Sequence, residues 1–256
     1  MPRPYSRRKT RFVNMKLLSE GARRLGLTLS PRGLKAFQIY YEELIAWNER
    51  FNLTAITDYE QVQIRHFLDS LSCLLSDESL PTSLSRQSTQ VIDVGAGAGF
   101  PGLPLKIVYP PFRLTLLEAM GKKTAFLDHM VEKLGLEGVV VIKARAEELG
   151  HDTRHRERYD VALARAVAGL PVLVEYTLPF CRRNGLLIAQ KGEEAQAEVI
   201  AAQQAMSILG GRLRRIVTVE IPGLAQPRSL VVIEKAALTP EKYPRRPGIP
   251  SKRPLK

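Results

Sequence analysis

Apolar positions near the start of the chain recur at the spacing of helices that bury one face. Between residues 31 and 54, apolar residues recur at i, i+3, i+4 and i+7, a period that predicts an amphipathic helix. The same period returns between residues 61 and 75. We therefore predict a small helical unit over residues 1–76. Residues 77–90 are rich in serine and also hold threonine and proline, which predicts a connector without regular structure.

From residue 91 onward, short apolar runs alternate with helical periods. Such alternation predicts a parallel sheet covered by helices on both faces. A helix is expected over residues 194–209, and the last two runs are too close together for a helical crossover, so they should pair antiparallel. Over residues 91–236 this pattern matches the mostly parallel seven-stranded sheet of class I methyltransferases that use S-adenosylmethionine (SAM), a Rossmann-like α/β fold. The runs expected to be strands are 91–94, 114–117, 139–142, 160–163, 186–189, 212–222 and 229–235.

A glycine-rich loop follows the first of these strands. Glycines at 95, 97, 99 and 102 let backbone N–H groups turn sharply and approach a ligand, as in loops that bind nucleotide-type cofactors. The same spacing also fits the loop of nicotinamide-dependent enzymes, and a tight turn without a ligand is a further alternative. The acid at the end of the strand favours SAM. We therefore predict SAM contacts at Asp93, Gly95 and Gly97.

Polar side chains follow the other strands, at the sheet edge where ligands of such folds bind. Glu118 is placed to accept the two ribose hydroxyls, or else is an acid favoured by a helix N-terminus. Ala146 and Glu147 either contact the adenine or simply begin a helix. Arg165 lies in an apolar setting and needs an anionic partner, either the cofactor carboxylate or an RNA phosphate. Lys191 could reach a phosphate or lie on the surface.

The net charge of +12 is concentrated at the two ends of the chain. Residues 1–11 hold five lysines and arginines and no acid, and residues 241–256 hold six against one glutamate. Two basic arms on a nearly neutral body predict a polyanionic partner such as RNA, although they could also serve solubility alone. Five prolines predict that the tail, residues 237–256, is extended rather than packed.

The cysteines, the histidines and the lengths of the apolar runs exclude several classes of protein. Cys73 and Cys181 lie far apart, and the four histidines form no ligand cluster with them, so neither a disulfide nor a metal site is expected. No apolar run reaches the roughly 18 to 20 residues that a bilayer span needs, and the basic start of the chain lacks the apolar core of a secretory signal. We expect a cytoplasmic protein.

The chemistry expected at the site needs no catalytic base. Methylation of an exocyclic amine uses an Asn/Asp-Pro-Pro-aromatic loop after the fourth strand, and this chain has Ala164-Arg165-Ala166 there. Methylation of cytosine C5 needs a thiolate, but Cys181 precedes the fifth strand in a different setting. The N7 atom of guanine carries a free lone pair and no proton, so alignment with a methyl donor is sufficient.

Taken together, these segments resemble one family, the bacterial 16S rRNA guanine-N7 methyltransferases once called glucose-inhibited division protein B. The resemblance covers nearly the whole chain and extends beyond the glycine loop. It rests on Trp47-Asn48, Phe51-Asn52-Leu53-Thr54, Arg65-His66-Phe67-Leu68-Asp69-Ser70, residues 93–104, Lys122-Lys123 ahead of Phe126-Leu127, residues 144–148, Ala164-Arg165-Ala166 and residues 242–248.

The resemblance implies methyl transfer from SAM to N7 of a guanine in the 530 loop of 16S rRNA, at position 527. The partner would be 16S rRNA or the small ribosomal subunit, and the protein a monomer. Arg165 would position the reactants, and Arg65, His66 and Asp69 would form a cluster that is either RNA-facing or structural. Transfer to another RNA, and a non-catalytic RNA-binding assembly factor, are the alternatives. The implied cofactor contacts are Gly95, Phe100, Glu118, Ala146, Glu147 and Arg165. The candidate RNA contacts are Arg65, His66, Lys122, Lys123, Lys191, Arg245 and Arg246.

Overall fold

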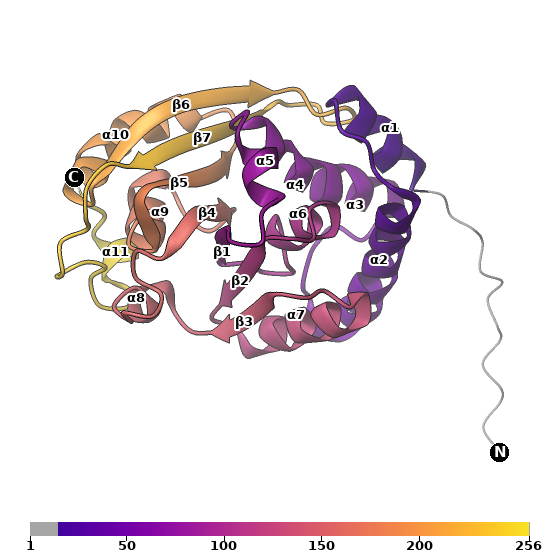
Figure 1. The fold of residues 1–256 in the computed structure, drawn as a ribbon, viewed down its shortest axis with the longest axis horizontal. Coiled ribbons are helices and arrows are strands. Elements are labelled where there is room, and N and C mark those ends of the chain that lie inside the picture. The colour runs from indigo at the N-terminus through magenta and orange to yellow at the C-terminus, as the bar shows by residue number, and fades with distance from the viewer. Residues whose placement is uncertain (1–14, 256) are drawn as a thin grey trace, which may run out of the picture.

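One seven-stranded sheet forms the centre of the molecule, in a computed structural model that describes residues 15–255 (Figure 1). Its strand order is β3-β2-β1-β4-β5-β7-β6. Neighbours from β3 to β5 run parallel, whereas β7 pairs antiparallel with both β5 and β6. The predicted fold class is thereby confirmed. The strands are β1 (Gln90–Val94), β2 (Arg113–Glu118), β3 (Val139–Lys143), β4 (Tyr159–Arg165), β5 (Cys181–Lys191), β6 (Gly211–Val219) and β7 (Arg228–Lys235).

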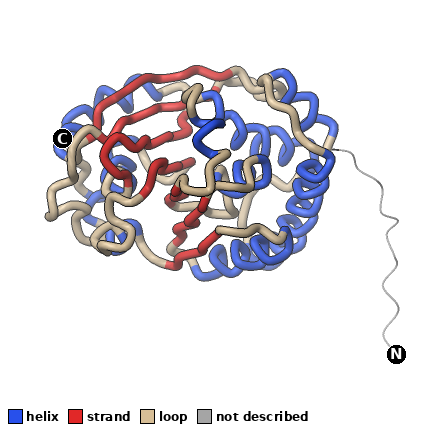
Figure 2. Tube along the Cα trace, viewed as in Figure 1, coloured by secondary structure: helices blue, strands red, loops and turns tan. Residues whose placement is uncertain are grey.

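Helices cover both faces of the sheet, and each face has its own apolar core (Figure 2). Because chain order reverses beside β1, the connections that follow β1 and β4 run to opposite faces of the sheet, and ligands of such sheets bind at the carboxyl ends of these strands. The basic N-terminal arm, residues 1–11, lies outside the described residues. The helices that follow strands are α6 (Gly102–Val108), α7 (Gly121–Leu134), α8 (Ala146–Leu149), α9 (Leu170–Thr177) and α10 (Ala195–Ile208).

The N-terminal helical unit shares the core on one face of the sheet. Phe37, Tyr40 and Phe67 are fully buried, and the Phe67 ring packs against both of the others. The Tyr40 ring stacks on that of Phe100, which belongs to the glycine loop region, and Phe67 contacts the same ring at a tilt. The second predicted helix is interrupted by a π-helical stretch, η1, and such bulges are frequent at functional sites. The unit comprises α1 (Lys16–Arg24), α2 (Pro31–Phe51), α3 (Tyr59–Val62), η1 (Gln63–Leu68), α4 (Asp69–Leu71) and η2 (Ser72–Leu75).

The prediction of a structureless connector over residues 77–90 is wrong. The segment contains the short helix α5 (Leu80–Leu84), and both of its leucines are buried. Asp77 accepts from Arg215 of β6 at 2.6 Å, which ties the segment to the edge of the sheet. The composition of the segment is polar overall, but its two leucines, Leu80 and Leu84, stand at i and i+4. That spacing is enough for one buried helical turn.

The prediction of an extended, unpacked tail is also wrong. Tyr243 is buried, and the tail contains a short helix, α11 (Ile249–Lys252). Arg156 donates to the backbone carbonyls of Thr239, Pro240 and Tyr243. Prolines remove N–H donors but keep their carbonyl acceptors. A proline-rich segment can therefore pack against a domain that supplies the donors.

Candidate active site

The glycine loop owes its shape to residues without a side chain. Gly95, Gly97 and Gly99 have φ of +72°, +61° and +94°, a region that residues with a Cβ rarely adopt. The N–H of Gly102 donates to Asp93 Oδ2 at 2.8 Å, and a Cβ at Gly102 would lie 2.8 Å from the same oxygen. Asp93 is fully buried, and this burial raises its pKa to about 7. Asp93 thus supports the loop from below.

A cleft of about 320 Å³ opens between this loop and the carboxyl ends of β2, β3 and β4. Glu118 accepts from the N–H of Gly97 with Oε2 at 3.0 Å and from that of Met120 with Oε1 at 2.9 Å. Each of these oxygens keeps a further lone pair for a hydroxyl of a bound ribose. The cleft is lined by Val94, Gly95, Leu117, Glu118, Ala119, Lys123, Ala144, Arg145, Ala146, Glu147, Ala166, Val167 and Tyr176.

The structure brings Gly95, Glu118, Ala146 and Glu147 together around this cleft, as expected for one cofactor site. The other predicted contacts lie around it. Asp93 is beneath the loop, and Phe100 packs between Tyr40 and His66, at ring-centroid distances of 5.3 and 4.6 Å. A Cβ at Gly97 would meet only the carbonyl oxygen of Gly95, at 3.8 Å, among described residues. The cleft and its open, glycine-lined margin fit a nucleoside-type group such as that of SAM.

A second cavity, of about 360 Å³, adjoins the first at Ala166, which lines both. Ala166 has a φ of +55°, and such strained backbone in a residue with a Cβ tends to occur at functional sites. Four cationic side chains and one acid line the cavity, which we call the basic pocket and which is suited to a phosphate-bearing ligand. It is lined by Arg65, His66, Asp69, Arg165, Ala166, Gln190, Lys191, Gly192 and Arg228.

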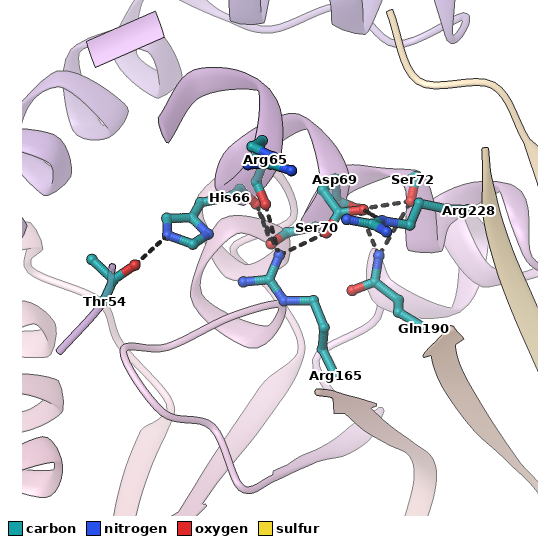
Figure 3. A network of polar contacts seen from close by, with 9 residues as sticks. All are labelled: Thr54, Arg65, His66, Asp69, Ser70, Ser72, Arg165, Gln190 and Arg228. Carbon is teal, nitrogen blue, oxygen red and sulfur yellow. Dashed lines mark hydrogen bonds and ion pairs between the residues drawn. The ribbon is translucent and has the colours of Figure 1, made fainter. Parts of the chain in front are cut away.

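Arg165 is held in place at the end of β4 by Asp69 (Figure 3). Its Nη1 lies 2.9 Å from Asp69 Oδ2, and its guanidinium carbon lies 4.9 Å from the centroid of the Phe100 ring. The other oxygen of Asp69 accepts from Arg228 Nε at 2.8 Å. A buried carboxylate between two guanidiniums fixes both arginines, and these three side chains together carry one net positive charge.

His66 lies mostly buried between the helical unit and the loop. Its ring stacks on Phe100, and its Nε2 lies 2.8 Å from Thr54 Oγ1. Burial, together with the charge of Arg165, lowers the pKa of His66 to about 3, so the ring is neutral at physiological pH. His66 and Asp69 are buried and have partners within the fold, whereas Arg65 is exposed, and all three line the basic pocket.

The low pKa of His66 predicts a dependence of stability on pH. Because this pKa lies below its value of 6.5 in the unfolded chain, the unfolded state binds more protons in acid, and the free energy of unfolding falls as pH drops from 6.5 toward 3. We expect His66→Phe, which keeps a ring against Phe100, to flatten this part of the dependence. Urea unfolding of both proteins at about pH 7 and about pH 5 measures the difference. If both proteins lost the same free energy of unfolding between these two pH values, the low pKa of His66 in the folded protein would be contradicted.

Two of the candidate RNA contacts are already paired with acids. Lys191 Nζ lies 2.7 Å from Glu198 and also donates to the carbonyl of Ala168, and Arg245 binds both oxygens of the fully buried Glu175. Neither side chain is therefore a free cation, although Lys191 still lines the basic pocket. The exposed candidates are Arg65, Lys122 and Arg246, whereas Lys123 lines the cleft.

Arg228 is one of two polar residues of the basic pocket that the sequence did not predict. It begins β7, and β7 runs antiparallel to β5, so its first residue lies at the edge where β5 ends. The signal was available, because residues at the start of an antiparallel strand share this edge with the carboxyl ends of the parallel strands. Gln190, which donates to the carbonyl of Asp69 at 2.6 Å, was missed as well.

Both cysteines are buried as free thiols. Within residues 15–255 no group of three His, Cys, Asp or Glu side chains is arranged to hold a metal ion. None of the described helices combines the length and the apolar character that a bilayer span requires.

Comparison with known proteins decides the family. The model of the family described as rRNA small subunit methyltransferase G matches residues 33–229. The chain belongs to this family. The predictions of a SAM-dependent methyltransferase and of this family are thereby confirmed.

Relatives of the rRNA small subunit methyltransferase G family match this chain over most of its length. The protein of this name from Roseiflexus sp. (strain RS-1) is 52% identical over 94% of this chain and 100% of its own. That from Pelotomaculum thermopropionicum is 48% identical over 93% and 97%.

Solved structures share the fold at lower identity. MtNAS in complex with MTA and tNA is 17% identical, with a TM-score of 0.52 over 87% of this chain and 76% of its own. A predicted O-methyltransferase from Agrobacterium tumefaciens is 20% identical, with a TM-score of 0.51 over 66% and 81%.

Proposed function

We propose that the protein transfers a methyl group from SAM to N7 of a guanine in the 530 loop of 16S rRNA, at position 527. The observation that carries this proposal is the pair of adjoining cavities, a cofactor cleft and a basic pocket that meet at Ala166. Methyl transfer requires two such sites side by side. The names of the relatives, ribosomal RNA small subunit methyltransferase G, support a ribosomal RNA as the acceptor.

The residues of the cleft would hold SAM, which supplies an electrophilic methyl group when bound. Glu118 would accept the ribose hydroxyls, since its oxygens stand at the mouth of the glycine loop. Ala146 and Glu147, at the start of α8, would contact the adenine side. The loop glycines would let backbone N–H groups approach the ligand closely.

The basic pocket would receive the target guanine, turned out of the RNA. Arg228 and Arg65 would attract the phosphates beside it, and Arg165 would stay fixed next to the base because Asp69 holds it. No side chain has to remove a proton, since N7 has none, and the neutral, mostly buried His66 is not poised as a base near neutral pH. Alignment and charge compensation would supply the rate.

RNA outside the pocket would be bound by exposed cations and by the basic N-terminal arm, with an affinity that falls as salt rises. Lys122 of α7 and Arg246 of the tail are exposed candidates for such contacts. The monomeric state and the cytoplasmic location stay predictions.

Methyl transfer from labelled SAM to purified RNA tests this function. We expect label in 16S rRNA, supplied free or in the small subunit, and none in 23S rRNA. Label in another RNA would support transfer to a different substrate, and binding of 16S rRNA without label would support a non-catalytic assembly factor. Calorimetric titration should show binding of SAM and none of NAD.

A further inference from the structure

The tail lies beside α8 and α9, two helices that contribute residues to the lining of the cofactor cleft (Figure 1). The N–H of Gly248 donates to Glu147 Oε1 at 3.0 Å. Glu147 is itself buried and lines the cleft. A tail residue thus directly holds a side chain of the predicted adenine site.

The tail also packs against the C-terminal end of α8, a helix of only four residues. Pro244 packs on Gly150 so closely that a Cβ there would lie 2.8 Å from Pro244 Cγ. Arg156 Nη1 joins the carbonyls of Gly150 and Tyr243, at 2.8 Å from each. A helix of one turn has little stability of its own, so its position depends on these contacts.

Arg245 anchors the tail to α9. Its backbone N–H and its Nε both donate to Glu175 Oε1, at 2.8 and 2.9 Å, and its Nη2 donates to Oε2 at 2.6 Å. Glu175 is fully buried, so the pair is a strong, charge-assisted one. The next residue of α9, Tyr176, lines the cleft.

We propose that the tail, through Arg245, Gly248 and Pro244, is a positioning element of the cofactor cleft that sets the affinity for SAM. This inference rests on the proposed function only in placing SAM in that cleft. It assigns the segment a role different from the RNA contact that its basic composition suggests. Arg245 and Gly248 are positioning residues, because they act through Glu175 and Glu147.

Arg245→Ala tests the proposal, because SAM binding can be measured separately from the rate of methyl transfer and from RNA binding. Because the anchor is a charge-assisted contact, we expect the Kd and the KM for SAM to rise about tenfold, while kcat at saturating SAM and the Kd for 16S rRNA stay unchanged. Arg245→Lys, which keeps the charge without the bidentate geometry, should restore part of the SAM affinity.

Arg215→Ala is the control. Arg215 lies 2.6 Å from another buried carboxylate, Asp77, which also pairs with Arg214 at 3.1 Å. Arg215 belongs to the edge strand β6 and does not line the cleft. We expect this substitution to lower stability without changing the Kd for SAM. If it weakened SAM binding as much as Arg245→Ala, the effect would be general loosening, and the proposal would be overturned.

Gly150→Ala keeps the test valid if Arg245→Ala fails to fold. It changes no charge and its backbone suits alanine, but the added methyl group must push Pro244 away. SAM affinity should fall here too, whereas Gly33→Ala, whose methyl group would meet only Ser30 Oγ at 3.4 Å, should leave it unchanged. Unchanged SAM affinity in Gly150→Ala, or a loss of RNA affinity alone in Arg245→Ala, overturns the proposal. Failure of the wild-type protein to bind SAM would instead refute the proposed function.

Discussion

Gly192→Leu is expected to lower methylation of RNA severely while the affinity for SAM stays unchanged. Gly192 lines the basic pocket, has no φ in the left-handed region, and a Cβ there meets no described atom within 4 Å. Leucine would therefore fit without strain and occupy space that the target base needs. Because misplacement of a reactant by even an ångström is costly, kcat/KM for rRNA should fall by about a hundredfold or more.

Glu193→Leu is the control for this substitution. It places the same side chain one position further along, at an exposed residue that does not line the pocket. It should methylate rRNA like the wild-type protein. Equal activity of Gly192→Leu and Glu193→Leu would show that the base does not enter the basic pocket.

Arg165→Ala is expected to produce the second large loss of activity. Loss of a charge-assisted contact costs about 1.5 to 3 kcal/mol, which is roughly one to two decades in kcat/KM. SAM affinity should change little, since Arg165 lines the basic pocket rather than the cleft. Thermal unfolding should show a smaller change, because Asp69 keeps Arg228 as a partner. Methylation kinetics at wild-type level in this variant would remove Arg165 from the mechanism.

Much of the fold follows from local patterns. Each strand of the sheet was predicted, although β5 begins at Cys181, well before the predicted run 186–189. The parallel strands could be found because buried parallel strands are short apolar runs that need no partner to be identified. Gly95, Glu118, Ala146 and Glu147 could be placed at one cleft for a related reason. Carboxyl ends of parallel strands share one edge of the sheet, so the spacing along the chain fixes the place in space.

Pairing between distant charges could not be predicted in this way. Arg245 carries a positive charge in a basic tail, and only the fold reveals that Glu175, 70 positions away, is buried beneath it. Lys191 is likewise paired with Glu198, which lies on the next helix, and the sequence alone does not show this pairing. Composition reports how many cations a segment holds, whereas tertiary contacts decide which of them remain free for RNA.

Mapping of the methylated nucleotide tests the central claim most directly. 16S rRNA from cells that lack the gene, before and after incubation with the purified protein and SAM, would be cleaved chemically at N7-methylguanine and sequenced. The account predicts one new N7-methylguanine, at position 527 in the 530 loop, and much less of it when Gly192→Leu replaces the wild-type protein. Methylation at another atom or another nucleotide, or none at all, would contradict it.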